Sequence, residues 1–216
     1  MKLSSVLKGF TLIVMVTSIV GCKSDFHIDI YSSDLFLNEN VDTPAQMMVE
    51  IPTCANRSEY ESSILALFDS ASKAKIVGCE EQGMNSMLVV SIAAEIATEN
   101  STRDVILFRQ NADDLVRDKQ VFEVRGLKPL ISPKFLARIN SLMKENMQTL
   151  SYEKVTIRLS LNNDERENIL ITGYNLWVNG KPYQRFYRQK LGRREKVELI
   201  FSKVMSDLVI RGDQPL

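Results

Sequence analysis

The sequence has few of the residues that usually build active sites and metal sites. It contains one histidine, His27, and one tryptophan. A single histidine excludes any catalytic or metal-binding arrangement that needs two, so we interpret His27 as structural. The chain also lacks a GxSxG elbow, a GxxxxGK phosphate loop and a GxGxxG sequence. We therefore predict no enzyme activity, no catalytic residues, no metal site and no cofactor.

Neither sign of charge dominates the chain. Its 216 residues include 27 basic and 27 acidic residues, and 44% are hydrophobic. This composition is typical of a globular protein, and the balanced charge gives no general attraction to nucleic acid. We expect no nucleic-acid partner.

Long apolar runs are confined to the beginning of the chain. Lys2 and Lys8 precede an almost unbroken apolar run at residues 10–20, which ends in Ile19, Val20, Gly21 and Cys22. This run is shorter than the roughly 20 residues that a membrane-spanning helix needs, and its order of features is typical of an export signal. A cleaved secretory signal with a chance cysteine, or an uncleaved anchor helix, is the alternative.

The four residues from Ile19 to Cys22 resemble the lipobox of bacterial lipoproteins. This resemblance covers about the first tenth of the chain and implies a signal peptide at residues 1–21, cleavage before Cys22 and a lipid anchor on that cysteine. Several acyl chains would attach the protein to a membrane almost permanently. The residues after the cysteine guide sorting in Gram-negative lipoproteins, and Lys23 and Ser24 imply the outer membrane, with the domain facing the periplasm.

The other two cysteines form an even pair in a compartment that permits disulfides. Cys54 and Cys79 are therefore predicted to bond to each other. Two free buried thiols or a metal pair are the alternatives, but there is no CxxC spacing and no second histidine to complete a zinc site.

Hydrophobic periodicity predicts an α+β domain over residues 22–216, with 25–126 and 127–216 as a possible division into two subdomains. Alternating patterns indicate strands near 25–31, 45–51, 75–98 and 155–161. Two main helices are expected, from Asn56 or Ser58 to about Ala71, and from Ser132 and Pro133 to about Met147. The last third is expected to be an antiparallel β-meander.

The strongest turn signal is Asn179-Gly180, which predicts a hairpin between residues 168–178 and 181–191. Basic residues follow this turn and alternate with Tyr183, Phe186 and Tyr187. They suggest a site for an anionic ligand or a partner, because arginine beside aromatic rings can form charge-assisted hydrogen bonds and stack. The alternative is an exposed hairpin whose aromatic side chains face the core. The candidate binding residues are Lys181, Arg185, Arg188, Lys190, Arg193 and Arg194.

The body of the chain resembles small lipoproteins encoded in prophages and other mobile elements of Gram-negative bacteria. The resemblance lies in residues 28–35, Thr43-Pro44 and the paired Cys54 and Cys79. It implies an envelope protein and supplies no catalytic residues. We therefore expect a lipid-anchored envelope protein that acts by binding or as a structural protein, with a protein partner in the envelope. A carrier or sensor for a lipid or a glycan is the second expectation.

Overall fold

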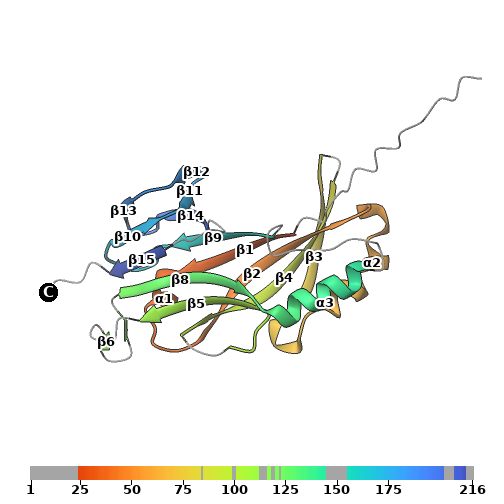
Figure 1. The fold of residues 1–216 in the computed structure, drawn as a ribbon, viewed down its shortest axis with the longest axis horizontal. Helices are drawn as coiled ribbons and strands as arrows, with labels where there is room; N and C mark the ends of the chain where they lie inside the picture. Colours follow the sequence, from red (N-terminus) through yellow and green to blue (C-terminus); the bar gives the residue numbers. More distant parts are fainter. Residues whose placement is uncertain are drawn as a thin grey trace, which may run out of the picture.

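The computed structural model describes residues 24–83, 85–98, 101–111, 116–117, 120–121, 123–144, 155–201 and 207–212 (Figure 1). The helices are α1 (Ser32–Leu35), α2 (Ser58–Leu65) and α3 (Pro133–Lys144), with 3-10 turns η1 (Cys54–Asn56) and η2 (Ser70–Ser72). The strands are β1 (Ser24–Tyr31), β2 (Val41–Ile51), β3 (Lys75–Gln82), β4 (Asn85–Ala97), β5 (Val105–Asn111), β6 (Val116–Arg117), β7 (Gln120–Val121), β8 (Glu123–Ile131), β9 (Val155–Asn162), β10 (Ile169–Tyr174), β11 (Leu176–Val178), β12 (Lys181–Tyr183), β13 (Tyr187–Leu191), β14 (Lys196–Phe201) and β15 (Asp207–Gly212).

Thirteen of these strands form one sheet in the order β12-β11-β14-β9-β1-β2-β4-β5-β8-β15-β10-β13, with β3 paired to β4 outside this path. Strands β6 and β7 form a separate pair. The pairs β1–β9 and β4–β5 are parallel, and the other described pairs are antiparallel. A mainly antiparallel α+β chain with two main helices is thus confirmed at the level of fold class, and strands dominate it.

The predicted C-terminal meander is wrong. Strand β9 pairs with β1 and β14, whereas β10 pairs with β13 and β15. All eight residues of β1 pair with residues of β9. Strand β1 therefore lies beside β9 in the place that a meander would give to β10. Alternation along a strand predicts which face is buried, but not which neighbour lies beside it.

The core is the inner face of this sheet. Phe26, Ile28 and Ile30 of β1 are fully buried, and so are Leu159 and Leu161 of β9. The residues of β1 alternate with partly exposed ones, as the period-two pattern predicts for a strand with one buried face. On β9, Ser160 between Leu159 and Leu161 is also buried. Corresponding positions on β2, β4, β5, β8, β10, β14 and β15 belong to the same cluster.

The sheet is strongly curved, because its first and last strands follow one another in the chain. Strand β12 ends at Tyr183 and β13 begins at Tyr187, so three residues connect the two ends of the strand order. Figure 1 shows the C-terminal strands β10 to β15 gathered at one end of the molecule, and helices α2 and α3 at the other.

Helix α3 begins as predicted. The Ser132 hydroxyl accepts a hydrogen bond from the Phe135 backbone N–H at 3.1 Å, and Pro133 occupies the first helical position. Phe135 is fully buried and packs against Phe26 and Phe68, with ring centroids 6.4 and 4.9 Å apart. The predicted end near Met147 lies outside the described residues.

Helix α2 is shorter than predicted, because it ends at Leu65 rather than near Ala71. Asp69 explains the difference, since its carboxylate accepts hydrogen bonds from the backbone N–H and the hydroxyl of Ser72 and thereby begins the separate turn η2. The residue before α2 is Arg57, which makes no side-chain cap, so neither Asn56 nor Ser58 caps the helix.

Strand β2 begins at Val41, four residues earlier than predicted, and contains Pro44. The ladder between β1 and β2 runs only as far as the pair Ile28 and Ala45, so Pro44 lies just beyond it. Proline lacks a backbone N–H and is tolerated where a ladder is interrupted. In the described part of the chain, no helix is long and apolar enough to cross a membrane.

Candidate interaction surface

The predicted hairpin is present, and its turn has the expected backbone. Asn179 and Gly180 have φ values of 48° and 76°. Next to the turn Val178 pairs with Lys181, and further along the hairpin Leu176 pairs with Tyr183. The Asn179 backbone N–H and side-chain oxygen bond to the backbone of Glu198 on β14, both at 2.9 Å. The turn is therefore fixed to the neighbouring strand.

The hairpin has two halves, which belong to opposite ends of the sheet. Strand β11 pairs with β12 and β14, whereas β10 pairs with β13 and β15. On the first arm, Asn175 lies between β10 and β11 and has a φ of 54°. On the second arm, residues 184–186 lie between β12 and β13. Each of β12 and β13 thus has one described neighbour, so this arm forms a sheet edge.

All six predicted basic residues are exposed. Five of them make no side-chain hydrogen bond or ion pair with the described protein: Lys181, Arg185, Arg188, Arg193 and Arg194. Elsewhere, cations such as Arg103 and Lys73 pair with acidic side chains. The arm therefore presents uncompensated positive charge.

The aromatic residues of this arm differ in their exposure to solvent. Tyr187 is 6% exposed, and its burial and then the nearby Tyr183 raise the pKa of its hydroxyl. Tyr183 packs edge-on against Tyr187 with centroids 4.8 Å apart, but is itself 36% exposed. Phe186 is 67% exposed. The alternative in which all three rings face the core is thus wrong for Phe186, whereas Tyr183 shares the face of Leu176 and is only partly covered.

Two further aromatic residues were missed by sequence reasoning. Trp177 is 46% exposed, because its neighbours Leu176 and Val178 take the inward positions, and it pairs with Pro182 across the hairpin. Tyr174 is 38% exposed. The period-two pattern at residues 176–178 was a signal that could have placed Trp177 outside. The register places Lys181 and Tyr183 on the face of Leu176 and Val178, and Trp177 on the opposite face, so the exposed residues lie on both faces of this edge. We call these exposed aromatic and basic residues together the basic–aromatic surface: Tyr174, Trp177, Tyr183, Phe186, Lys181, Arg185, Arg188, Lys190, Arg193 and Arg194.

Arg193 and Arg194 lie in the turn between β13 and β14, at the end of β1 that is remote from Ser24. The Arg194 backbone N–H bonds to the Asn163 carbonyl at 2.7 Å, and Asn162 lies opposite Tyr31. Seven residue steps of β1 separate Tyr31 from Ser24, or about 23 Å at a typical strand rise. The anchor site Cys22 itself lies outside the described residues.

A polar cluster that the sequence did not reveal supports this turn. The Asp164 carboxylate accepts hydrogen bonds from the Ser33 hydroxyl at 2.6 Å, the Ser33 backbone N–H at 3.0 Å and the Ser32 hydroxyl at 2.9 Å. Burial raises the pKa of Asp164, but these hydrogen bonds outweigh burial, so its pKa lies below the usual 3.8. Burial and then the charge of Asp164 raise the pKa of Asp34, while Arg109 lowers it.

Arg109 is a second residue that sequence reasoning missed. It follows Val105 and Leu107 on the inward face of β5 and is fully buried. Its guanidinium donates to the carbonyls of Asp34 at 3.3 Å and Glu39 at 2.9 Å, and also to those of Leu35 and Leu37. Burial lowers its pKa to about 10, against the opposing effect of Asp34, so it stays charged at neutral pH. These contacts give Arg109 a structural role at the end of α1.

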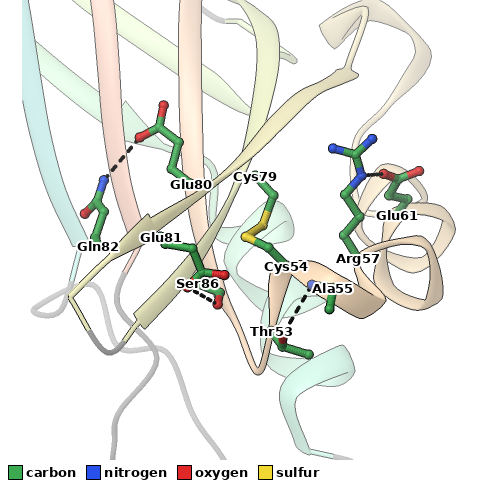
Figure 2. Close-up of a disulfide and its surroundings, with 10 residues drawn as sticks. All are labelled: Thr53, Cys54, Ala55, Arg57, Glu61, Cys79, Glu80, Glu81, Gln82 and Ser86. Carbon is green, nitrogen blue, oxygen red and sulfur yellow. Dashed lines mark hydrogen bonds and ion pairs between the residues drawn. A yellow bond between two sulfur atoms is a disulfide. The ribbon is translucent and has the colours of Figure 1, made fainter.

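The remaining predicted residues lie elsewhere. The structure contains the disulfide between Cys54 and Cys79, with Cα atoms 5.7 Å apart, joining η1 to the edge strand β3 (Figure 2). His27 lies on β1 with Nε2 3.4 Å from Asp29 Oδ1. Within the described residues, no three His, Cys, Asp or Glu side chains form a group that would hold a metal ion.

Comparison with known proteins identifies the family of the chain. No curated protein and no solved structure matches the chain. A family model described as a domain of unknown function (DUF7424) matches residues 24–215, which include all the strands and helices described above. The chain therefore belongs to the DUF7424 family.

Proposed function

We propose that the protein is a lipid-anchored lipoprotein of the cell envelope that acts by binding a partner rather than by catalysis. The observation that carries this proposal is the basic–aromatic surface. Four of its aromatic side chains are at least 36% exposed, and five of its cations have no acidic partner among the described residues. Exposed aromatic rings grouped with arginines are typical of interaction sites. The anchor is proposed from the sequence that ends at Cys22.

The filled interior favours surface binding over an internal carrier site. A cavity large enough for a ligand would leave accessible area on the side chains that line it. Phe26, Ile30, Leu107, Leu159 and Ile171 point inward from four strands of the sheet and have none. A carrier of the kind that holds a lipid inside its fold is therefore the less favoured proposal.

The anchor is tested by measuring the intact mass of the protein from separated inner and outer membranes. We expect a chain that begins at an acylated Cys22, enriched in the outer membrane, and that gains two protons on reduction of the disulfide. A Cys22→Ser variant is the control and should carry no acyl chains. A soluble, unacylated wild-type chain would refute the anchor.

Partner binding is tested by reversing three cations of the surface. A variant with Arg185, Arg188 and Arg193 changed to glutamate should lose its cross-linked products in intact envelopes, because buried charge pairs and arginine contacts dominate such interfaces. The matched control changes Lys75, Lys128 and Lys134, which are exposed elsewhere, to glutamate. Unchanged products from the first variant would rule out the surface as the partner site.

A further inference from the structure

Strand β13 is the edge of the thirteen-stranded sheet that is least protected against pairing with another strand. Sheet edges present unpaired backbone N–H and C=O groups, which proteins usually protect with prolines, bulges or charged side chains. The ladder of β3 is interrupted by a bulge between Ile76 and Gly78, and β12 contains Pro182. Strand β13 pairs with β10 over five consecutive residues without a register shift, and no other described strand lies beside it.

The open side of β13 offers hydrogen-bonding groups of the backbone. In an antiparallel pair, every second residue directs both its N–H and its C=O away from its partner strand. An extended segment that adds to such an edge gains main-chain hydrogen bonds, and its alternate side chains give specificity.

The outer face of β13 determines the charge of such a segment. Arg188 lies opposite Thr172, so the described neighbouring strand supplies no carboxylate there. Lys190 lies two residues further along the same face, and both side chains are exposed. Residues directly opposite each other on paired strands have Cβ atoms about 5 Å apart, and opposite charges there stabilise the pair. Acidic residues at alternate positions of the segment would therefore fit this face.

The inner face favours apolar residues. Tyr187, Gln189 and Leu191 lie on the face of the buried Ile171. A β-branched residue opposite Tyr187 would form the kind of aromatic pair that stabilises sheets. Phe186 directly precedes the strand and is 67% exposed, so its ring is available to the end of the same segment.

A second copy of the chain does not fit this edge. Two β13 strands paired antiparallel about Gln189 would place Arg188 of one copy opposite Lys190 of the other. By two-fold symmetry this repulsion would occur twice, and like charges directly opposite each other destabilise a sheet. The edge therefore disfavours its own sequence and favours an acidic one.

We propose that β13 accepts an added strand from the protein partner, and that this strand is an extended segment in which acidic and apolar residues alternate. This inference rests on the proposed function and names the way in which its partner binds. The acidic residues lie opposite Arg188 and Lys190, and the apolar residues lie opposite Tyr187 and Leu191. Backbone hydrogen bonds supply affinity, and the alternation fixes the register.

The probe is a synthetic peptide of alternating glutamate and valine, added to the processed full-length protein in detergent. We expect binding by fluorescence anisotropy, and slower hydrogen exchange by NMR at the β13 amides that face the open edge. A peptide with the same residues in one acidic and one apolar block should bind much more weakly. Methylation of alternate peptide nitrogens removes the donors of one face only, so the two possible sets should weaken binding unequally.

Variants test the charge of the outer face. Arg188→Glu should weaken binding of the glutamate–valine peptide about tenfold, because an attractive cross-strand pair becomes a repulsive one. A lysine–valine peptide should bind this variant more tightly than it binds wild type. Lys128→Glu is the matched control, since Lys128 is exposed on β8, and it should bind the acidic peptide as wild type does.

Unchanged exchange of the β13 amides, or equal effects of the two methylated sets, would overturn the proposal. A dimer in sedimentation whose β13 amides are protected without peptide would assign the edge to a second copy and would also overturn it. If the peptide fails but the triple glutamate variant still loses its cross-linked products, the proposed function stands without strand addition. Peptide binding together with unchanged cross-linked products would instead refute the proposed partner site, while the strand-accepting edge stands.

Discussion

At the scale of single residues, the buried charge of Arg109 is explained by its hydrogen bonds to backbone carbonyls. Arg109 has no accessible surface, yet its guanidinium reaches four carbonyl groups between Asp34 and Glu39. The C-terminal carbonyls of a helix have no partner within the helix, and α1 has only four residues. Arg109 therefore holds the chain that leaves α1 against the end of the core.

Replacing Arg109 by methionine should destabilise the protein strongly. The apolar stem would remain, but several buried carbonyls would lose their donor, so we expect the free energy of unfolding to fall by roughly 3–5 kcal/mol. Urea unfolding followed by circular dichroism measures this. Arg158→Met is the control, since Arg158 is 39% exposed in a pair at 3.6 Å, and should change stability by less than about 1 kcal/mol. Equal effects of the two changes would contradict the role of Arg109.

Asp164 should make stability depend on pH. Its pKa is lower in the folded protein than the usual 3.8, so its carboxylate stabilises the fold above that pH, and this stabilisation is lost as pH falls through the folded pKa. We therefore expect wild type to exceed Asp164→Asn in unfolding free energy at pH 6, with a difference that narrows below pH 3.8. Thermal unfolding at several pH values measures the difference. A difference that stays constant across this range would exclude the linkage.

At the scale of elements, the disulfide restrains an edge of the sheet. Strand β3 pairs only with β4 among the described strands, and Cys79 on β3 is bonded to Cys54 in η1, 25 residues earlier. Figure 2 shows the bond between the strand and the turn before α2. The loop that contains α2 is thereby fixed at both ends.

Changing Cys54 and Cys79 together to alanine should lower the free energy of unfolding by about 3 kcal/mol, because the unfolded chain regains the freedom of the closed loop. Chemical denaturation of the variant and of reduced wild type measures the loss. The reduced wild type serves as the control and should match the variant. An oxidised wild type no more stable than either would argue against this contribution.

The sequence predicted the elements better than their arrangement. Asn179-Gly180 placed the hairpin correctly and Ser132-Pro133 placed the start of α3, because both signals depend on the local backbone. The end of α2 was missed, since the side chain of Asp69 begins a competing turn. Pairing of β1 with β9 depends on residues far apart in the chain, and no local pattern encodes it.

For the candidate surface too, sequence patterns predicted single residues better than contacts between distant segments. The exposure of the basic residues was predicted from the sequence, because charged side chains in an alternating strand are usually exposed. For Phe186 the sequence left open both a binding site and a ring that faces the core. Trp177 and Tyr174 were missed, although the alternation at residues 176–178 could have placed Trp177 outside. Arg109 and the Asp164 cluster depend on contacts between distant segments, as shown by the separation of 131 residues between Ser33 and Asp164.

At the scale of the whole molecule, the features described here are separated in space. Helices α2 and α3 and the C-terminal strands lie at opposite ends of a curved sheet whose interior is filled (Figure 1). The proposed anchor precedes one end of β1, and the turn that carries Arg193 and Arg194 lies near the other end. The length of β1 therefore separates the proposed anchor from this turn of the basic–aromatic surface.

The parallel pairing of β1 with β9 also determines when the protein can fold. Ser24 pairs with Val155, so the first strand cannot complete its place in the sheet until most of the chain has emerged. Pairings between such distant segments form slowly, because the intervening chain must first be closed into a loop. An exported chain with this topology would stay open throughout its passage across a membrane, and its N-terminal end would remain accessible to processing enzymes before the last strands arrive.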